Sequence, residues 1–348
     1  MDTTAEPLYP HDDPALPSGS QSPVEHPSTL RWIFLGADGL RAGWGLLLFA
    51  VMVGSLGFCI NFMIRRLGGP DPHAMKPGDE IPPLIGIISE AVSFLLVWFV
   101  TWIMSKIEGR RNSIYGFGDR RGVTHFFAGL AWGITCLSLL VLTLWKTGLL
   151  VFGGRLLFGG DILRYGAIWL FGFLTVGLLE EYVTRGYVQY TLTRGLAAIY
   201  QWAFKTRHGA ALGFWTSAII FSVLFGMGHK GNPGESPIGL LSAGLAGMVF
   251  CLSLWRTGSL WWAIGFHTSW DWAQSFVYGV ADSGLMTQHH LMATHPVGKP
   301  ILSGGTTGPE GSVMILGVFV LIVLIIFFTL PNSREKYGLS SHTELRSA

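Results

Sequence analysis

Long apolar stretches recur along this chain and limit the folds open to it. A hydrocarbon core about 30 Å thick is crossed by a helix of roughly 20 apolar residues. The composition agrees with a membrane protein, since 50% of the 348 residues are hydrophobic and only 13% are charged. We therefore expect an all-α polytopic membrane protein of about eight transmembrane helices. The windows lie near 44–64, 82–105, 124–145, 165–188, 210–228, 237–255, 260–280 and 312–331.

The ends of the chain differ in composition from this membrane domain, which we place at 31–331. Residues 1–30 are polar and rich in proline, with no apolar run typical of a signal peptide, and predict a disordered tail. Residues 332–348 form a second polar tail. With eight spans, most Lys and Arg residues fall on the side of the two termini, which favours cytoplasmic termini.

Charge and cysteine content exclude other classes of protein. The net charge of +2 comes with no basic tract, so no nucleic-acid partner is expected. The three cysteines form no C-x-x-C pair and lie in apolar windows, which argues against a disulfide framework or a zinc knuckle. The partners expected are membrane lipid and whatever substrate the polar residues of the spans act on.

The first polar motif is E-E-x-x-x-R at residues 180–185, which is expected to close the fourth span. A carboxylate within hydrocarbon costs about 2.5–3.5 kcal/mol on insertion scales, so two adjacent ones need a reason. Glu181 and Arg185 are i, i+4 on a helix and are predicted to pair. Glu180 points about 100° away and has no local cation, which suits a general base. The alternative is that all three residues lie among lipid headgroups.

The second motif is F-x-x-x-H at residues 225–229, at the end of the fifth span. A single histidine at a span end usually lies in the interface. Gly226 and Gly228 would let another helix approach closely, which would place His229 against a neighbouring helix. Interfacial and functional positions for His229 both stay open.

The third motif is H-x-x-x-D at residues 267–271, within the seventh span. His267 and Asp271 are i, i+4 and share one helix face, so they can act on the same water, metal ion or carbonyl group. The alternative is a hydrogen bond that only satisfies two buried polar groups. Two further features have no assigned role: Glu90 in the second span and the long polar loop 282–311.

Together the three motifs resemble the CPBP family of intramembrane proteases, which includes the type II CAAX prenyl endopeptidases and the bacteriocin-processing (Abi) proteins. The family pattern is E-E-x-x-x-R, F-x-x-x-H and H-x-x-x-N/D, in this order, and it is matched over about residues 120–280. The motifs of zincins, serine hydrolases and P-loop proteins are absent. The resemblance implies a polar cavity between the helices, open to the cytoplasmic side and to lipid, in a bacterial cytoplasmic membrane.

The resemblance also implies roles for individual residues. Glu180 would activate the attacking water, with His229, His267 and Asp271 as catalytic partners and Glu181 with Arg185 as a supporting pair. Prenyl-processing members are expected to carry Asn at the last position, whose amide can donate to an oxyanion. An ionised Asp271 cannot donate. Asp271 would then be protonated, orient His267 or bind a metal.

Three hypotheses about the function of the chain therefore compete. The first is an endopeptidase acting on membrane-associated or lipidated, CAAX-like peptides without a required cofactor. A variant of it makes Glu180, His229, His267 and Asp271 ligands of a divalent metal such as zinc. The second is a non-catalytic membrane scaffold or bacteriocin self-immunity factor, and the third is a transporter with buried proton sites.

Overall fold

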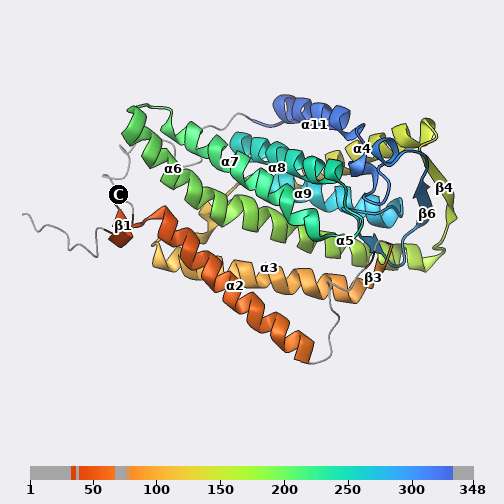
Figure 1. Ribbon diagram of the computed structural model, residues 1–348, viewed down its shortest axis with the longest axis horizontal. Helices are drawn as coiled ribbons and strands as arrows, with labels where there is room; N and C mark the ends of the chain where they lie inside the picture. The colour runs from red at the N-terminus through yellow and green to blue at the C-terminus, as the bar shows by residue number, and fades with distance from the viewer. Residues whose placement is uncertain (1–32, 37–38, 67–75, 77, 332–348) are drawn as a thin grey trace, which may run out of the picture.

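The computed structural model describes residues 33–36, 39–66, 76 and 78–331, so both predicted polar tails lie outside the described residues. Helices account for most of the described chain and run roughly along its long axis (Figure 1). The main helices are α2 (Ala42–Arg66), α3 (Pro83–Ile107), α4 (Gly122–Lys146), α5 (Gly160–Glu181), α6 (Gln189–Phe204), α7 (Gly209–Gly228), α8 (Pro237–Thr257), α9 (Trp261–Asp271) and α11 (Ile315–Thr329).

The all-α polytopic membrane fold is confirmed, but the count of eight spans is not. Among the described residues, six helices are long and apolar enough to cross a membrane, and they correspond to the first six predicted windows. The seventh window contains α9, which has only 11 residues, followed by a π-helical segment at Trp272–Val277. The eighth contains α11, whose 15 residues are fewer than a bilayer crossing needs.

The fourth span does not end where the sequence predicts. The chain stays helical from Gly160 to Phe204, over 45 residues, through a π-helical segment at Tyr182–Val188. The helix ends only where Lys205 adopts a left-handed conformation. It continues because α6 packs on α7, where Gly213 faces the backbone of Ala197 with no room for a side chain. The first motif therefore lies inside a long helix.

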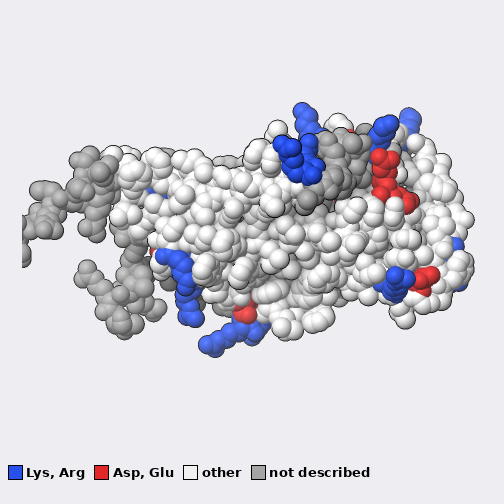
Figure 2. All heavy atoms as spheres, turned by 90° about the horizontal axis from the view of Figure 1, so that it is seen from below, with Lys and Arg blue, Asp and Glu red and all other residues white. Residues whose placement is uncertain are grey.

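The surface fits a lipid environment. Figure 2 shows a broad face without charged residues, with Lys, Arg, Asp and Glu gathered near its margins. Large apolar side chains point outward along α2, α5 and α11, including Phe58 at 72%, Leu163 at 80% and Phe328 at 85% exposure. In water such a surface would drive aggregation, whereas a bilayer covers it.

Helix α9 lies in the centre of the molecule and is held closely by α4. Gly129 and Gly133 of α4 face the backbone of Trp262 and Phe266, and Gly265 of α9 faces the backbone of Phe126. A Cβ atom at any of the three glycines would overlap these atoms. Small residues thus let the two helices touch backbone to backbone, as is common in membrane proteins.

The two ends of the molecule differ. At one end the first described segment contacts α6 and the last contacts the C-terminal end of α8, since Arg194 donates to Leu40 O at 3.0 Å and Arg256 to Leu330 O at 2.6 Å. The opposite end carries the long polar loop, which is folded against its neighbours (Figure 1). There β3 (Glu80–Ile81) pairs in parallel with β5 (Met286–Thr287), and β4 (Leu150–Arg155) pairs antiparallel with β6 (Met292–Pro296).

Candidate functional site

The first motif provides a buried ion pair and a second, more accessible carboxylate. Arg185 Nη1 lies 2.7 Å from Glu181 Oε1, and both side chains are almost fully buried. The guanidinium also lies over the Phe225 ring, 4.7 Å from its centroid. The Glu180 side chain is 30% exposed. The expected division is therefore present: Glu181 pairs with Arg185, and Glu180 is the carboxylate that a substrate could reach.

Two π-helical segments begin directly after acidic residues of the site. One starts at Tyr182, after Glu181, and the other at Trp272, after Asp271. The wider π turn changes the direction in which the following side chains point from the helix axis. Such turns are often found at functional sites. These segments are a feature that the sequence analysis did not detect.

His267 is surrounded by carboxylates. Its Nδ1 lies 3.0 Å from Glu181 Oε1, while its Nε2 lies 3.7 Å from Glu180 Oε2 and 3.5 Å from Asp271 Oδ2. Carboxylates accept hydrogen bonds, and a neutral imidazole donates from one nitrogen only. Only the imidazolium can therefore donate to both sides at once. The Glu181 contact was not expected from the sequence.

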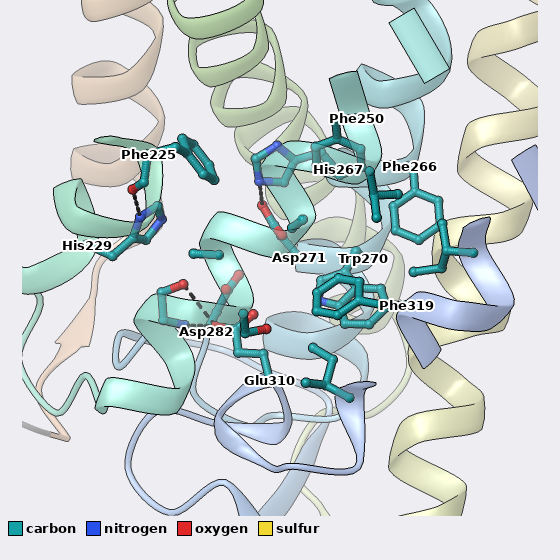
Figure 3. Close-up of a pocket in the computed structure, with 17 residues that line it drawn as sticks. Phe225, His229, Phe250, Phe266, His267, Trp270, Asp271, Asp282, Glu310 and Phe319 are labelled. Atoms are coloured by element: carbon teal, nitrogen blue, oxygen red, sulfur yellow. Dashed lines mark hydrogen bonds and ion pairs between the residues drawn. The ribbon is translucent and has the colours of Figure 1, made fainter. Parts of the chain in front are cut away.

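His229 lies at the end of α7, and its orientation is set by the helix that it follows. Its Nδ1 is 2.8 Å from the carbonyl oxygen of Phe225, which can only accept, so Nδ1 carries the proton. The Phe225 ring lies near both imidazoles, with centroid distances of 4.9 Å to His229 and 6.5 Å to His267 (Figure 3). His229 is half-buried and lies at the site.

The candidate residues of all three motifs line one cavity. It has a volume of about 160 Å³, which is enough to hold several water molecules. Its walls come from α3, α5, α9 and the loops after α7 and α9. The candidate residues that line it are Glu180, His229, His267 and Asp271, and Glu90, to which no role was assigned, lines it as well.

The loop after α9 adds acidic residues that the sequence analysis did not single out. Asp282 lines the same cavity, and Glu310 lies nearby, where it accepts hydrogen bonds from the backbone and the hydroxyl of Ser283. Burial raises the pKa of Asp282 well above its usual value of 3.8, and the negative charges of Asp271 and Glu310 raise it further. No sequence spacing marks these residues, because the folded loop brings them to the helices.

The loops that line the cavity and the described ends of the chain lie at different ends of the molecule. The cavity is lined by Ile81, Asn232 and Leu285, which belong to the end of the molecule that carries the paired loops. The first and last described residues lie at the opposite end. The side of the membrane on which the termini lie and the side on which the cavity opens both stay predictions.

The candidate residues do not form a metal-binding group in this arrangement. Within the described part of the chain, no three or more His, Cys, Asp or Glu side chains are grouped so that they could hold a metal ion. Contacts between His267 and its carboxylates are direct ones, at hydrogen-bond or ion-pair distances. The zinc alternative stays a prediction.

The fold and the site define a polytopic membrane protein with an internal cavity of carboxylates and imidazoles. Comparison with known families agrees with this class: residues 162–273 match the family described as type II CAAX prenyl endopeptidase Rce1-like. The matched segment contains all three motifs, so the predicted resemblance to this family is confirmed over these residues. No curated protein and no solved structure matches the chain. Glu90, Asp282 and Glu310 lie outside the matched segment.

Proposed function

We propose that this chain is an intramembrane endopeptidase in which Glu180 activates a water molecule. The observation that carries the proposal is the convergence of Glu180, His229, His267 and Asp271 on one cavity that can hold water. The match to the Rce1-like family supports the same reaction class. The substrates proposed are membrane-associated or lipidated peptides, because the cavity lies between helices with an apolar outer surface.

The proposed reaction begins with a proton transfer. Glu180 takes a proton from the water as the oxygen attacks the peptide carbonyl, which becomes a tetrahedral oxyanion. The imidazolium of His267, held at Nδ1 by Glu181, stabilises this negative charge by donating from Nε2. The C–N bond then breaks, and the proton on Glu180 passes to the departing amine. The products are a free amine and a carboxylic acid, which becomes a carboxylate by releasing its proton to water.

A glutamine at position 180 tests the proposal, since it keeps the size of the side chain but cannot accept a proton from water. We expect Glu180→Gln to lower kcat at least about 100-fold, in keeping with the loss of a general base. The matched control is Glu80→Gln, an exposed carboxylate in β3 that does not line the cavity. Cleavage of membrane-bound reporter peptides by the purified full chain is the measurement. Undiminished turnover by a folded Glu180→Gln protein would refute the proposal.

The alternative is a non-catalytic scaffold or self-immunity factor that binds a peptide in the same cavity. This alternative predicts that variants unable to transfer a proton keep their function in cells, because binding a peptide does not require proton transfer. If Glu180→Gln and His267→Gln proteins kept full cellular function, the scaffold function would be favoured.

A further inference from the structure

The catalytic candidates lie between two cavities of different character. His229, His267 and Asp271 line both of them. One cavity runs between α8, α9 and α11, where its walls are mostly apolar, with Phe250, Phe266 and Phe319 among them (Figure 3). The other runs between α3 and α5. In a peptide lying across the histidines, the residues before and after the scissile bond would therefore lie in different cavities.

The cavity between α3 and α5 is lined by four carboxylates, those of Glu90, Glu180, Asp271 and Asp282, which outnumber the imidazolium of His267. Glu90 projects from α3 and Glu180 from α5, and both line it. Glu90 interacts electrostatically with Glu180 and has no hydrogen-bond or ion-pair partner among the described residues. None of the described residues that line either cavity is Lys or Arg. The nearby guanidinium of Arg185 is already paired with Glu181.

We propose that Glu90 is a specificity-determining residue that binds a Lys or Arg side chain of the substrate, while the cavity at α8 and α11 holds an apolar side chain on the other side of the scissile bond. This inference rests on the proposed peptidase function. A cationic side chain would relieve the repulsion between Glu90 and Glu180, and its methylene stem suits the apolar walls at Phe173 and Val176.

The same charge distribution disfavours acidic substrates. A carboxylate next to the scissile bond would face Glu90 and Glu180, and like charges brought together in a partly buried site oppose binding. The proposal therefore disfavours substrates that place an acidic side chain in the cavity between α3 and α5.

The test compares matched peptides that carry leucine on one side of the scissile bond and lysine, norleucine or glutamate on the other, in both orders. Norleucine keeps the methylene stem and lacks the charge. For the purified full chain, we expect kcat/KM for the lysine peptide to exceed that for the norleucine peptide at least about tenfold. The neutral side chain of norleucine would leave the Glu90 carboxylate unpaired. Glu90→Gln should bring this ratio close to one, and Glu90→Lys should favour the glutamate peptide. Glu80→Gln is the control and should keep the ratio.

Binding of the same fluorescent peptides to Glu180→Gln separates this inference from the proposed function. If the wild type cleaves the peptides without preferring lysine in either order, the inference is wrong and the peptidase function stands. If nothing is cleaved, tighter binding of the lysine peptide supports the cation site alone, and equal binding overturns it. If the Glu90 variants do not fold, the lysine-to-norleucine ratio of the wild type decides.

Discussion

Glu181 Oε1 lies 3.0 Å from His267 Nδ1, and this contact joins α5 to the central helix α9. The same oxygen atom lies 2.7 Å from Arg185 Nη1. One buried carboxylate thus neutralises a guanidinium and orients an imidazole of the candidate site. The buried ion pair and the orientation of the candidate catalytic histidine therefore depend on the same residue, Glu181.

We expect Glu181→Gln to destabilise the protein by about 3–5 kcal/mol, because it leaves the buried Arg185 charge without its partner. The double variant Glu181→Leu, Arg185→Met should recover much of this stability, since apolar side chains of similar size avoid the unpaired charge. Its activity should stay low, because His267 loses the acceptor at Nδ1. Thermal unfolding and peptide cleavage, measured side by side, check both effects. Recovery of activity together with stability would contradict the orienting role.

Asp271 distinguishes this chain from the Asn expected in prenyl-processing members. Asp271 Oδ2 lies 3.5 Å from His267 Nε2, a contact that an amide oxygen can also make. We expect Asp271→Asn to keep kcat within about tenfold, because it accepts from His267 and can also donate to an oxyanion. Asp271→Leu, which can do neither, should lose at least about 100-fold. Equal loss in both variants would show that the negative charge itself is needed.

Chelation tests the zinc alternative. Within the described residues no group of three or more ligands is arranged for a metal, so we expect cleavage to persist after treatment with a strong chelator. Metal analysis of the purified chain should then show well below one bound ion per molecule. Loss of activity on chelation, with recovery on adding zinc, would establish the metal variant.

The loop acids predict a pH dependence of stability. Burial raises the pKa values of both Asp282 and Glu310 above their usual 3.8 and 4.5. Each acid holds its proton more tightly in the folded state than in the unfolded state. Its contribution to the stability of the fold is therefore fully present below the usual pKa and is lost as the pH rises through the raised pKa. The Tm of the wild type should therefore fall as the pH rises from the usual pKa values to the raised ones. Asp282→Asn and Glu310→Gln should each flatten the decline, and an unchanged slope in both would contradict it.

The backbone contact between α4 and α9 predicts a size limit at Gly129. A Cβ atom there overlaps the carbonyl oxygen of Trp262, so Gly129→Ala should destabilise the protein by about 1–3 kcal/mol. It should also lower activity, because α9 carries His267. Gly54 of α2 has no atom near the position of an added Cβ, and Gly54→Ala is the matched control. Equal melting temperatures for the two variants would argue against the close packing.

The sequence alone determined the membrane class and the main candidate residues. Both depend on local patterns: apolar length sets a bilayer crossing, and i, i+4 spacing places Glu181 beside Arg185 and His267 beside Asp271. Where such a signal was weak, the prediction failed. The fourth helix continues to Phe204 because α6 packs on α7, and that contact is made by residues distant from its predicted end.

The tertiary structure alone decided which residues share a cavity. The contact between Glu181 and His267 spans 86 positions in the chain, and Glu90, Asp282 and Glu310 reach the site from another helix and from a folded loop. Spacing along one helix carries no information about such neighbours, because they depend on how helices pack. The residues that line the cavity follow from the same packing, which is why the sequence could supply the reactive groups but not their surroundings.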